Sequence, residues 1–376
     1  MPVLAVTKER RAGETRVAVT PDSAKKLIAL GFDVVVEMGA GLAASMPDAD
    51  YAAVGAKIVA TPDEAISAAD LVLKVRAPAD EEIAALKSGA IVVGLLNPFQ
   101  DREPVEDMAE KGATVFAMEF VPRITRAQVM DALSSQANLA GYRAVIEAAE
   151  TYGRAMPMMM TAAGTVAAAK VFVMGAGVAG LQAIATARRL GAVVTATDVR
   201  PAAKEQVESL GAKFVAVEDE EFKAAETASG YAKPMSEAYQ VKQAALVGEH
   251  IKKQDIVITT ALIPGRMAPK LVSAEAVASM KPGSVLIDLA VEQGGNVVGS
   301  KTGEIVDTGG VKIVGIPNLP GRIAADSSAL YARNLTAFAG LLIKDGAMVA
   351  DFEDEILQAA LIAKGGQIVH PILKAV

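Results

Sequence analysis

The sequence predicts an α/β protein with two doubly wound Rossmann-like domains and a cleft between them. Short aliphatic runs alternate with amphipathic helical stretches in two separate series along the 376 residues. The runs are nearly all apolar instead of alternating with polar residues, which is typical of parallel strands covered on both faces. A chain of this length also exceeds what one hydrophobic core usually fills, so two domains are expected.

The composition excludes several classes of function. Because the chain has no cysteine, it has no thiol nucleophile, cysteine-ligated zinc site, iron–sulfur cluster or disulfide, and we expect no metal site. The 37 basic residues are scattered among 44 acidic ones and the net charge is −7, which disfavours a nucleic-acid partner.

A mean hydropathy of +0.33 raises the question of a membrane segment. In residues 155–187 the only charge is Lys170, but several glycines and Gln182 interrupt the stretch, and its periodicity changes from strand to helix. We therefore expect buried core there and no membrane span. The N-terminus lacks the features of a signal or transit peptide, so a cytoplasmic location is expected.

The first predicted domain contains strands in the aliphatic runs 3–6, 34–36, 71–75, 91–94 and 114–117. Thr20 before Pro21 marks the N-cap and the first position of one helix, which Gly31 ends. A later helix begins at Thr61, which together with Glu64 predicts a capping box.

The second predicted domain contains strands in the runs 171–174, 193–197, 213–217, 256–259, 285–289 and 312–314. A helical segment at 134–155 precedes this series, and another at 330–343 follows it and is expected to return to the first domain. We therefore expect the first domain to comprise residues 1–133 and 322–376, and the second to comprise residues 134–321. Residues 218–243 are less regular and suit a mobile surface loop.

The most specific motif is Gly175-Ala176-Gly177-Val178-Ala179-Gly180, between the strand at 171–174 and a helix that ends at Gly191. In a dinucleotide-binding βαβ unit the first glycine permits the turn, the second lets the pyrophosphate approach the backbone, and the third allows close packing of helix on strand. Asp198 ends the next strand, 18 residues after Gly180, where a carboxylate accepts hydrogen bonds from the adenosine ribose. The motif predicts a dinucleotide site; the alternative is a glycine-rich packing turn in a domain that binds no nucleotide.

Asp198 also bears on the choice of nucleotide, since its charge repels the 2′-phosphate of NADP(H) and favours NAD(H), although Arg200 leaves some room for NADP(H). Glu292 follows the strand at 285–289, at the sheet edge where ligands bind in doubly wound folds. Asp288 could act similarly, and a turn or helix-capping role is the alternative for both carboxylates. The expected nucleotide contacts on this domain are Gly175, Ala176, Gly177, Val178, Ala179, Gly180, Asp198, Val199, Arg200, Thr260, Ala261, Leu262, Leu289 and Glu292.

Several segments of the chain resemble one known family. They are KERRAGETRVAVTP near the start, RITRAQVMDALSSQANLAGYRAV in the middle, MMMTAAGT before the glycine motif, and ITTALIPGRMAPKLV with MKPGSVLIDLAVEQGG after it. Together they closely resemble the NAD(H)-binding component of proton-translocating nicotinamide nucleotide transhydrogenases, over essentially the whole chain. Much of the pattern is shared with the related alanine dehydrogenases.

In transhydrogenases the counterpart of residues 123–135 is a loop beside the nicotinamide. The resemblance implies that Arg123, Asp131 and Ser134 orient the carboxamide and the ribose. It also implies that Gln128 reaches toward NADP(H) on the partner.

The residues alone leave a plainer alternative for this segment. A polar cluster of this kind commonly caps a helix, with Asp131 or Ser134 as the N-cap and with Arg123 and Arg126 as solvated charges. The resemblance further implies that Tyr231 belongs to a mobile loop and closes over bound nucleotide, whereas taken alone it would be a surface tyrosine.

Oxidation of an amino acid needs a group that gives or takes protons beside the reacting carbon, and alanine dehydrogenases use a histidine. This chain contains His250 and His370, and the matching position after the fourth strand reads Gly94-Leu95-Leu96-Asn97-Pro98. Hydride transfer between two nicotinamides needs no acid or base, only proximity, orientation and a dry contact, so the residues favour transhydrogenation. Arg16 and Lys74 match residues that bind the oxoacid carboxylate in alanine dehydrogenases. We expect them to be structural, in weak surface pairs, and a retained substrate site is the alternative.

The resemblance implies a Re/Si-specific, proton-translocating NAD(P)+ transhydrogenase that is catalytic only with its partners. It implies that NAD(H) binds to this chain and NADP(H) to a partner subunit, and that membrane-spanning subunits complete the complex. It also implies a homodimer that is peripheral to the inner membrane. Two alternatives stay open: a soluble L-alanine dehydrogenase, and a non-catalytic NAD-binding module.

Overall fold

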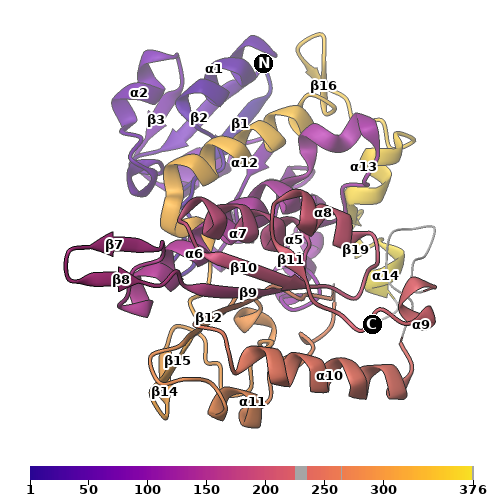
Figure 1. Ribbon diagram of the computed structural model, residues 1–376. Coiled ribbons are helices and arrows are strands. Elements are labelled where there is room, and N and C mark those ends of the chain that lie inside the picture. Colours follow the sequence, from indigo (N-terminus) through magenta and orange to yellow (C-terminus); the bar gives the residue numbers. More distant parts are fainter. Residues whose placement is uncertain (225–234, 264, 375–376) are drawn as a thin grey trace. The chain divides into compact units, whose positions relative to one another are not determined.

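The computed structural model describes residues 1–224, 235–263 and 265–374 (Figure 1). The chain forms two compact units, the first comprising Met1–Gln136 with Pro320–Val376 and the second comprising Ala137–Leu319. These limits differ by a few residues from the domain limits expected from the sequence, which stay a prediction, as does the cleft. Each unit is a mostly parallel sheet with helices, so the predicted fold class is confirmed.

The first unit is built on an eight-stranded sheet in the order β19-β18-β6-β5-β4-β1-β2-β3. Strands β1 to β6 pair in parallel, while β18 is antiparallel to β6 and β19 is antiparallel to β18. The strands are β1 (Val3–Val6), β2 (Asp33–Glu37), β3 (Lys57–Val59), β4 (Leu71–Leu73), β5 (Ile91–Gly94), β6 (Thr114–Ala117), β18 (Leu361–Lys364) and β19 (Gln367–Ile368).

Both faces of this sheet are covered, as the apolar runs predict. In β1, Leu4 and Val6 belong to one buried cluster and Ala5 to another, so alternate side chains enter two separate cores. The helices of the unit are α1 (Pro21–Ala29), α2 (Asp48–Ala53), α3 (Pro62–Ile66), α4 (Asp80–Ala85), α5 (Glu103–Glu110), α12 (Ala324–Ala339), α13 (Glu355–Ala360) and α14 (Pro371–Lys374).

The two predicted helix starts differ in how they are capped. Thr20 is the N-cap of α1 and Pro21 its first residue, and Ser23 completes a capping box with the backbone N–H of Thr20. At α3 the Thr61 hydroxyl accepts the backbone N–H of Glu64, but the Glu64 carboxylate accepts from Ala60 instead of Thr61. The predicted box at Thr61 is therefore half right.

The second unit is built on a seven-stranded sheet in the order β11-β10-β9-β12-β13-β15-β14. All neighbours pair in parallel except β14 with β15. Alternate residues of β9 again enter two cores, since Val171 and Val173 lie in one buried cluster and Phe172 and Met174 in another. The strands are β9 (Lys170–Met174), β10 (Val193–Thr197), β11 (Lys213–Phe214), β12 (Ile256–Thr259), β13 (Val285–Asp288), β14 (Ile305–Thr308) and β15 (Val311–Val314).

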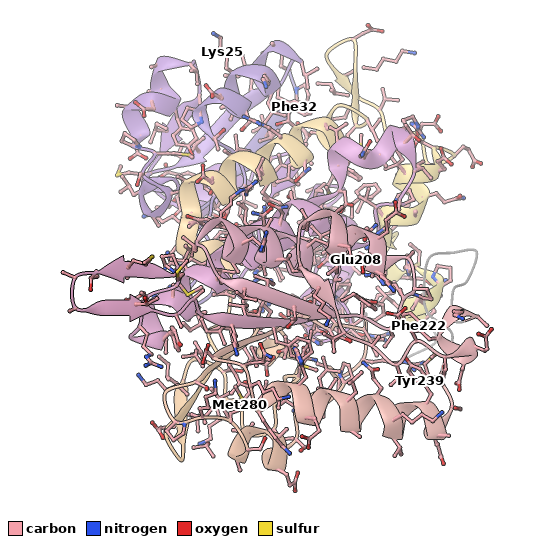
Figure 2. All side chains as sticks on the ribbon, in the orientation of Figure 1. Lys25, Phe32, Glu208, Phe222, Tyr239 and Met280 are labelled. Carbon is pink, nitrogen blue, oxygen red and sulfur yellow. The ribbon has the colours of Figure 1, made fainter. Side chains whose placement is uncertain are left out.

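The helices of this unit follow the strands as in a βαβ fold (Figure 1). They are α7 (Val178–Arg189), α8 (Ala203–Ser209), α9 (Glu220–Lys223), α10 (Glu237–Ile251) and α11 (Ala274–Ala278), and α6 (Ala132–Tyr152) leads into the unit from the first one. Phe222 of α9 and Tyr239 of α10 are labelled in Figure 2, and their rings stack with centroids 6.4 Å apart.

The prediction of buried core throughout residues 155–187 is wrong for the beginning of that stretch. Met159–Thr161 (β7) and Gly164–Val166 (β8) pair as an antiparallel hairpin that extends away from the sheet of the second unit in Figure 1. Met158 and Met160 are 60% and 80% exposed, so the lack of charge here does not reflect burial. Within the described ranges no helix has the length and apolar character needed to cross a membrane.

Candidate functional site

The glycine motif forms the turn from β9 into α7. Gly175 has a φ of +104°, a conformation that glycine adopts without strain, and its N–H donates to the Thr197 carbonyl at 2.9 Å. Gly177 is the N-cap of α7 and offers no side chain to the first N–H groups of the helix. The helix therefore starts as an anion-binding N-terminus usually does, with backbone donors and the positive end of its dipole at the turn.

The second and third glycines of the motif differ in what surrounds them. A methyl group on Gly180 would lie 1.8 Å from the Gly175 carbonyl oxygen, so the fold itself requires glycine there. A methyl group on Gly177 would meet no atom of the described residues within 4 Å. The packing of the chain therefore does not explain Gly177, whereas the close approach of a phosphate to the backbone would explain it.

Asp198, predicted to accept from the adenosine ribose, follows the end of β10 and already has several partners within the chain. Its carboxylate accepts from the N–H of Ala176 at 2.7 Å and forms two side-chain hydrogen bonds with Arg200, each of 3.0 Å. Arg200 therefore partly neutralises the charge that was expected to repel a 2′-phosphate. Its neighbour Val199 is exposed.

The carboxyl end of β12 lies directly beside this turn, since β9 and β12 are neighbours in the sheet. The Thr260 hydroxyl donates to the Gly175 carbonyl at 3.0 Å, and Ala261 follows with its N–H held by the Asn296 side chain. Leu262 is 48% exposed. Because the strand order reverses between β9 and β12, this is the switch point at which doubly wound folds bind ligands.

The residues after β13 have separate roles. The Leu289 N–H donates to the Thr259 carbonyl at 3.0 Å, and Glu292 is exposed and accepts from the Asn318 N–H at 3.1 Å. Asp288 is fully buried and accepts backbone N–H groups of its own loop, among them that of Ala290 at 3.0 Å. Asp288 thus fills the turn role that was its alternative.

The segment expected beside the nicotinamide lies in the first unit, and Gln128 and Arg123 are exposed there. Gln128 lies on a short 3₁₀ helix, Thr125–Met130. Asp131 accepts the N–H of Ser134 at 2.8 Å and its hydroxyl at 2.6 Å, so it caps the start of α6.

The plainer alternative treated Arg126 as a solvated charge, but this exposed side chain is paired. Its guanidinium binds Asp354 at 2.7 Å and Glu355 at 3.3 Å. The hydrogen bond from Arg126 lowers the pKa of Asp354 below its ordinary value. Tyr231 lies outside the described residues.

Arg16 and Lys74 are buried, which corrects the expectation of weak surface pairs. The Arg16 guanidinium binds both carboxylate oxygens of Glu14, at 2.7 and 2.6 Å. Lys74 is fully buried, and its Nζ atom lies 3.0 Å from Glu82 and 3.6 Å from Glu9. The sequence reasoning missed these three glutamates, although KERRAGET carries two of them close to Arg16.

The charges of this cluster shift two carboxyl pKa values in opposite directions. Burial would raise the pKa of Glu14, but the hydrogen bonds and charges of Arg16 and Arg76 outweigh it and lower that pKa to about 2. Burial dominates at Glu9 and raises its pKa, although Lys74 acts against it.

Both histidines are partly or fully enclosed. His250 forms a 2.8 Å hydrogen bond with the Thr195 hydroxyl inside the second unit, and His370 stacks on Phe120 with ring centroids 4.1 Å apart in the first. Burial lowers the pKa of each, which favours the neutral imidazole. Asn97 lies in the segment 94–98, where the resemblance to alanine dehydrogenases would place a histidine, and donates its backbone N–H to Glu119 at 2.6 Å.

Comparison with known proteins agrees with this architecture. The model of the alanine dehydrogenase/PNT N-terminal domain matches residues 5–140, and that of the C-terminal domain matches residues 144–371. The first part of NAD(P) transhydrogenase subunit alpha from Rhodospirillum rubrum is 55% identical over 377 residues, covering 98% of each chain. An alanine dehydrogenase of Halomonas elongata is 30% identical, covering 98% of this chain and 94% of its own.

A solved structure of transhydrogenase from Sinorhizobium meliloti matches 98% of this chain and 100% of its own, at 57% identity and a TM-score of 0.90. The similarity to transhydrogenase alpha subunits thus exceeds the similarity to alanine dehydrogenases across the same length of chain. The chain therefore belongs to the alanine dehydrogenase/PNT family, as a transhydrogenase alpha-subunit component within it.

Proposed function

We propose that this chain binds NAD(H) on its second unit and exchanges hydride directly with NADP(H) held by a partner subunit, in a proton-translocating, Re/Si-specific transhydrogenase. The open space at Gly177 is the observation that carries the proposal. Of the three glycines of this turn, Gly175 and Gly180 have close neighbours, whereas the space beside Gly177 holds no atom of the described residues. A pyrophosphate at the N-terminus of α7 would occupy this space, and the positive end of the helix dipole would stabilise its negative charge.

The nucleotide would extend along the carboxyl ends of β10, β9, β12 and β13. Asp198 and Val199 would contact the adenosine side, and the backbone after Thr260 and Leu289 would contact the nicotinamide half together with Glu292. Tyr231 would close over the bound nucleotide, as the family resemblance implies. In this proposal the chain supplies binding and orientation, and the hydride moves with its electron pair from one C4 atom to the other.

The segment that starts at Arg123 would complete the reaction site. Asp131 and Ser134 would orient the carboxamide and ribose with Arg123, while the exposed Gln128 would reach toward the NADP(H) of the partner. The hydrogen bonds between Asp131 and Ser134 favour this role, because they fix both side chains before any ligand arrives.

Enclosed histidines support hydride exchange over amino-acid oxidation. His370 is buried and stacks on Phe120, the partly buried His250 is hydrogen-bonded to Thr195, and Arg16 and Lys74 are already paired by carboxylates of the chain. We infer that the chain works as a homodimer held peripherally at the inner membrane by membrane-spanning partner subunits.

The test mixes the purified chain with the NADP(H)-binding partner subunit and follows reduction of an NAD analogue by NADPH. We expect turnover that needs both proteins, and no NAD reduction by L-alanine. Alanine-dependent reduction would identify an alanine dehydrogenase instead, and NADH binding without turnover in any mixture would identify a non-catalytic module.

Gln128→Asn sharpens this test at the level of one side chain. Shortening the exposed amide should slow hydride transfer about tenfold or more, because small displacements of reacting groups cost rate steeply. The matched control is Gln367→Asn, which shortens another exposed glutamine of the first unit and should leave the rate unchanged. Equal rates for the two variants would remove Gln128 from the proposal.

A further inference from the structure

We propose that Asn296 is a positioning residue, which fixes the backbone after β12 in the conformation that the nucleotide site needs. The inference rests on the proposed function, and it assigns a role to a side chain that lies outside the glycine motif. Asn296 is fully buried and lies in the loop that follows β13. No charge or reactive group draws attention to it in the sequence.

One side-chain amide satisfies both polar groups of a single neighbouring residue. The Oδ1 atom of Asn296 accepts the N–H of Ala261 at 3.0 Å, and its Nδ2 atom donates to the Ala261 carbonyl at 2.9 Å. The same Nδ2 atom donates to the Pro269 carbonyl at 2.8 Å. The amide therefore pairs with the backbone as a neighbouring strand would, at the point where β12 has ended.

The backbone of Asn296 holds the far side of the same loop. Its carbonyl accepts the N–H of Leu271 at 2.8 Å and that of Val272 at 3.1 Å. Asn296 thus holds the backbone both at Ala261 and, farther along, at Pro269, Leu271 and Val272. Leu262 next to Ala261 is 48% exposed, so apolar packing contributes little to fixing the backbone there; Ala268, farther along, is buried and donates its N–H to the Gln293 carbonyl at 2.8 Å.

Asn296 is itself held by Asp288, at the end of β13. The Asp288 carboxylate accepts the N–H of Asn296 at 3.1 Å and that of Val297 at 3.1 Å. Gly295 permits this approach, because its φ is +76° and a methyl group on it would lie 2.5 Å from an Asp288 oxygen. Asn296 is therefore itself held in position by Asp288, at the end of β13.

The anchored residue connects directly to the glycine motif. Ala261 follows Thr260, whose hydroxyl donates to the Gly175 carbonyl at 3.0 Å. A shift of the backbone at Ala261 would move Thr260 and, through it, the first residue of the phosphate turn. Asn296 would thereby set the nucleotide affinity although it touches no nucleotide.

Asparagine is the side chain that these contacts require. Aspartate has the same size, but it would place an acceptor against the carbonyl oxygens of Ala261 and Pro269, where two donated hydrogen bonds now lie. When protonated, that aspartate can donate one hydrogen bond again. Alanine would leave all three backbone groups without the amide.

The experiment compares Asn296→Asp and Asn296→Ala with wild type in the full chain. NADH affinity is measured by fluorescence titration, and hydrogen exchange of residues 260–272 is measured without nucleotide. We expect both variants to raise the Kd for NADH about tenfold or more and to speed exchange in this segment. For Asn296→Asp, the Kd relative to wild type should improve as the pH falls from 7 to 5, because protonation restores a donor.

Gln254→Ala is the matched control, since it removes another buried amide. Gln254 lies two residues before β12, at the amino end of this strand and away from the nucleotide site. This substitution should leave the NADH affinity unchanged. The inference is overturned if the Asn296 variants keep wild-type affinity and exchange, or if Gln254→Ala weakens NADH binding equally. If Asn296→Ala does not fold, Asn296→Asp and its pH profile decide. Wild type that binds no NADH would instead overturn the proposed function, and the exchange data alone would then decide whether Asn296 anchors the segment.

Discussion

The parallel strands of the two sheets are arranged in the same way, but the carboxyl edges of the two sheets differ. In each sheet the first strand has the next two strands on one side and three further parallel strands on the other, which are β4, β5 and β6 in the first unit and β12, β13 and β15 in the second. At the switch point of the first sheet, between β1 and β4, Lys74 Nζ lies 3.0 Å from both the Thr7 hydroxyl and the Glu82 carboxylate. At that of the second, the Thr260 hydroxyl meets the Gly175 carbonyl, and the turn beyond it has open space.

This difference shows that topology alone does not make a ligand site. The same geometry concentrates polar groups at the carboxyl ends of parallel strands, and the sequence decides what satisfies them. In the first unit the carboxylates of the chain itself neutralise Arg16 and Lys74. In the second unit, glycines replace side chains at the turn before α7, which is where we propose that an anion binds. Substitutions at the carboxyl edge of the first sheet should therefore change stability, and substitutions at that of the second should change nucleotide binding.

The largest effect is expected from Lys74→Met, which should destabilise the first unit without altering the NADH affinity. Removing this buried cation leaves Glu9 without its ion-pair partner and leaves Glu82 with Arg10 alone, at a cost of about 3–5 kcal/mol in the free energy of unfolding. Urea unfolding measures the loss. Lys87→Met, which breaks an exposed pair with Asp70, should cost at most about 1 kcal/mol. Equal losses for the two variants would show that the first edge is not a structural network.

Glu14 should make the stability of the chain sensitive to acid. Its pKa is about 2 in the folded chain and ordinarily 4.5, so its contribution is fully present above pH 4.5 and is lost as the pH falls toward 2. The shift corresponds to about 3 kcal/mol. Glu14→Gln should therefore flatten this acid limb in unfolding measurements between pH 5 and 2. The exposed Glu304→Gln should not, and an unchanged limb in Glu14→Gln contradicts the pairing.

At the second edge, Gly177→Ala should abolish tight NADH binding and leave the fold intact. The added methyl group meets no described atom of the chain but occupies the space assigned to the pyrophosphate. We expect the Kd to rise about a hundredfold and the unfolding free energy to fall by at most about 1 kcal/mol, the cost of alanine at an N-cap. Gly248→Ala in α10 also meets open space and should leave the Kd as in wild type. Wild-type affinity in Gly177→Ala would remove the phosphate from this turn.

The smallest effect concerns the choice between NADH and NADPH. Arg200→Ala removes the cation that binds Asp198, so the carboxylate should repel a 2′-phosphate more strongly. We expect the ratio of the Kd for NADPH to that for NADH to rise about tenfold. Arg189→Ala, at the end of α7, is the control and should not change the ratio. A falling ratio would mean that Arg200 does not assist NADPH binding.

Much of the fold could be predicted because buried parallel strands are short, apolar and separated by capped helices. The limits of β1 and β10 agree with their aliphatic runs, and Thr20 caps α1 as expected. The hairpin around Met160 was misjudged, since a lack of charge does not distinguish a buried strand from an exposed apolar one. The antiparallel β18 was missed because its pairing with β6 is not local in sequence.

Only those residues of the candidate site that belong to a sequence motif could be predicted. The glycine turn and Asp198 follow from fixed spacings, but pairing between side chains is set by the fold. The sequence therefore does not reveal that Arg200 pairs with Asp198, or that Asn296 is hydrogen-bonded to Ala261. It also treated Lys74 as a surface charge, because its counter-charges Glu9 and Glu82 become neighbours only when the sheet forms.

The most direct test of the comparison between the two edges is an NADH titration of the chain followed by assigned amide chemical shifts. We predict saturable shifts at residues 175–180, at Asp198 and at Ala261, with little change at residues 7–16 and 74–76. Shifts centred on residues 7–16 and 74–76, with residues 175–180 unperturbed, would place the ligand at the first edge and contradict the proposed binding site.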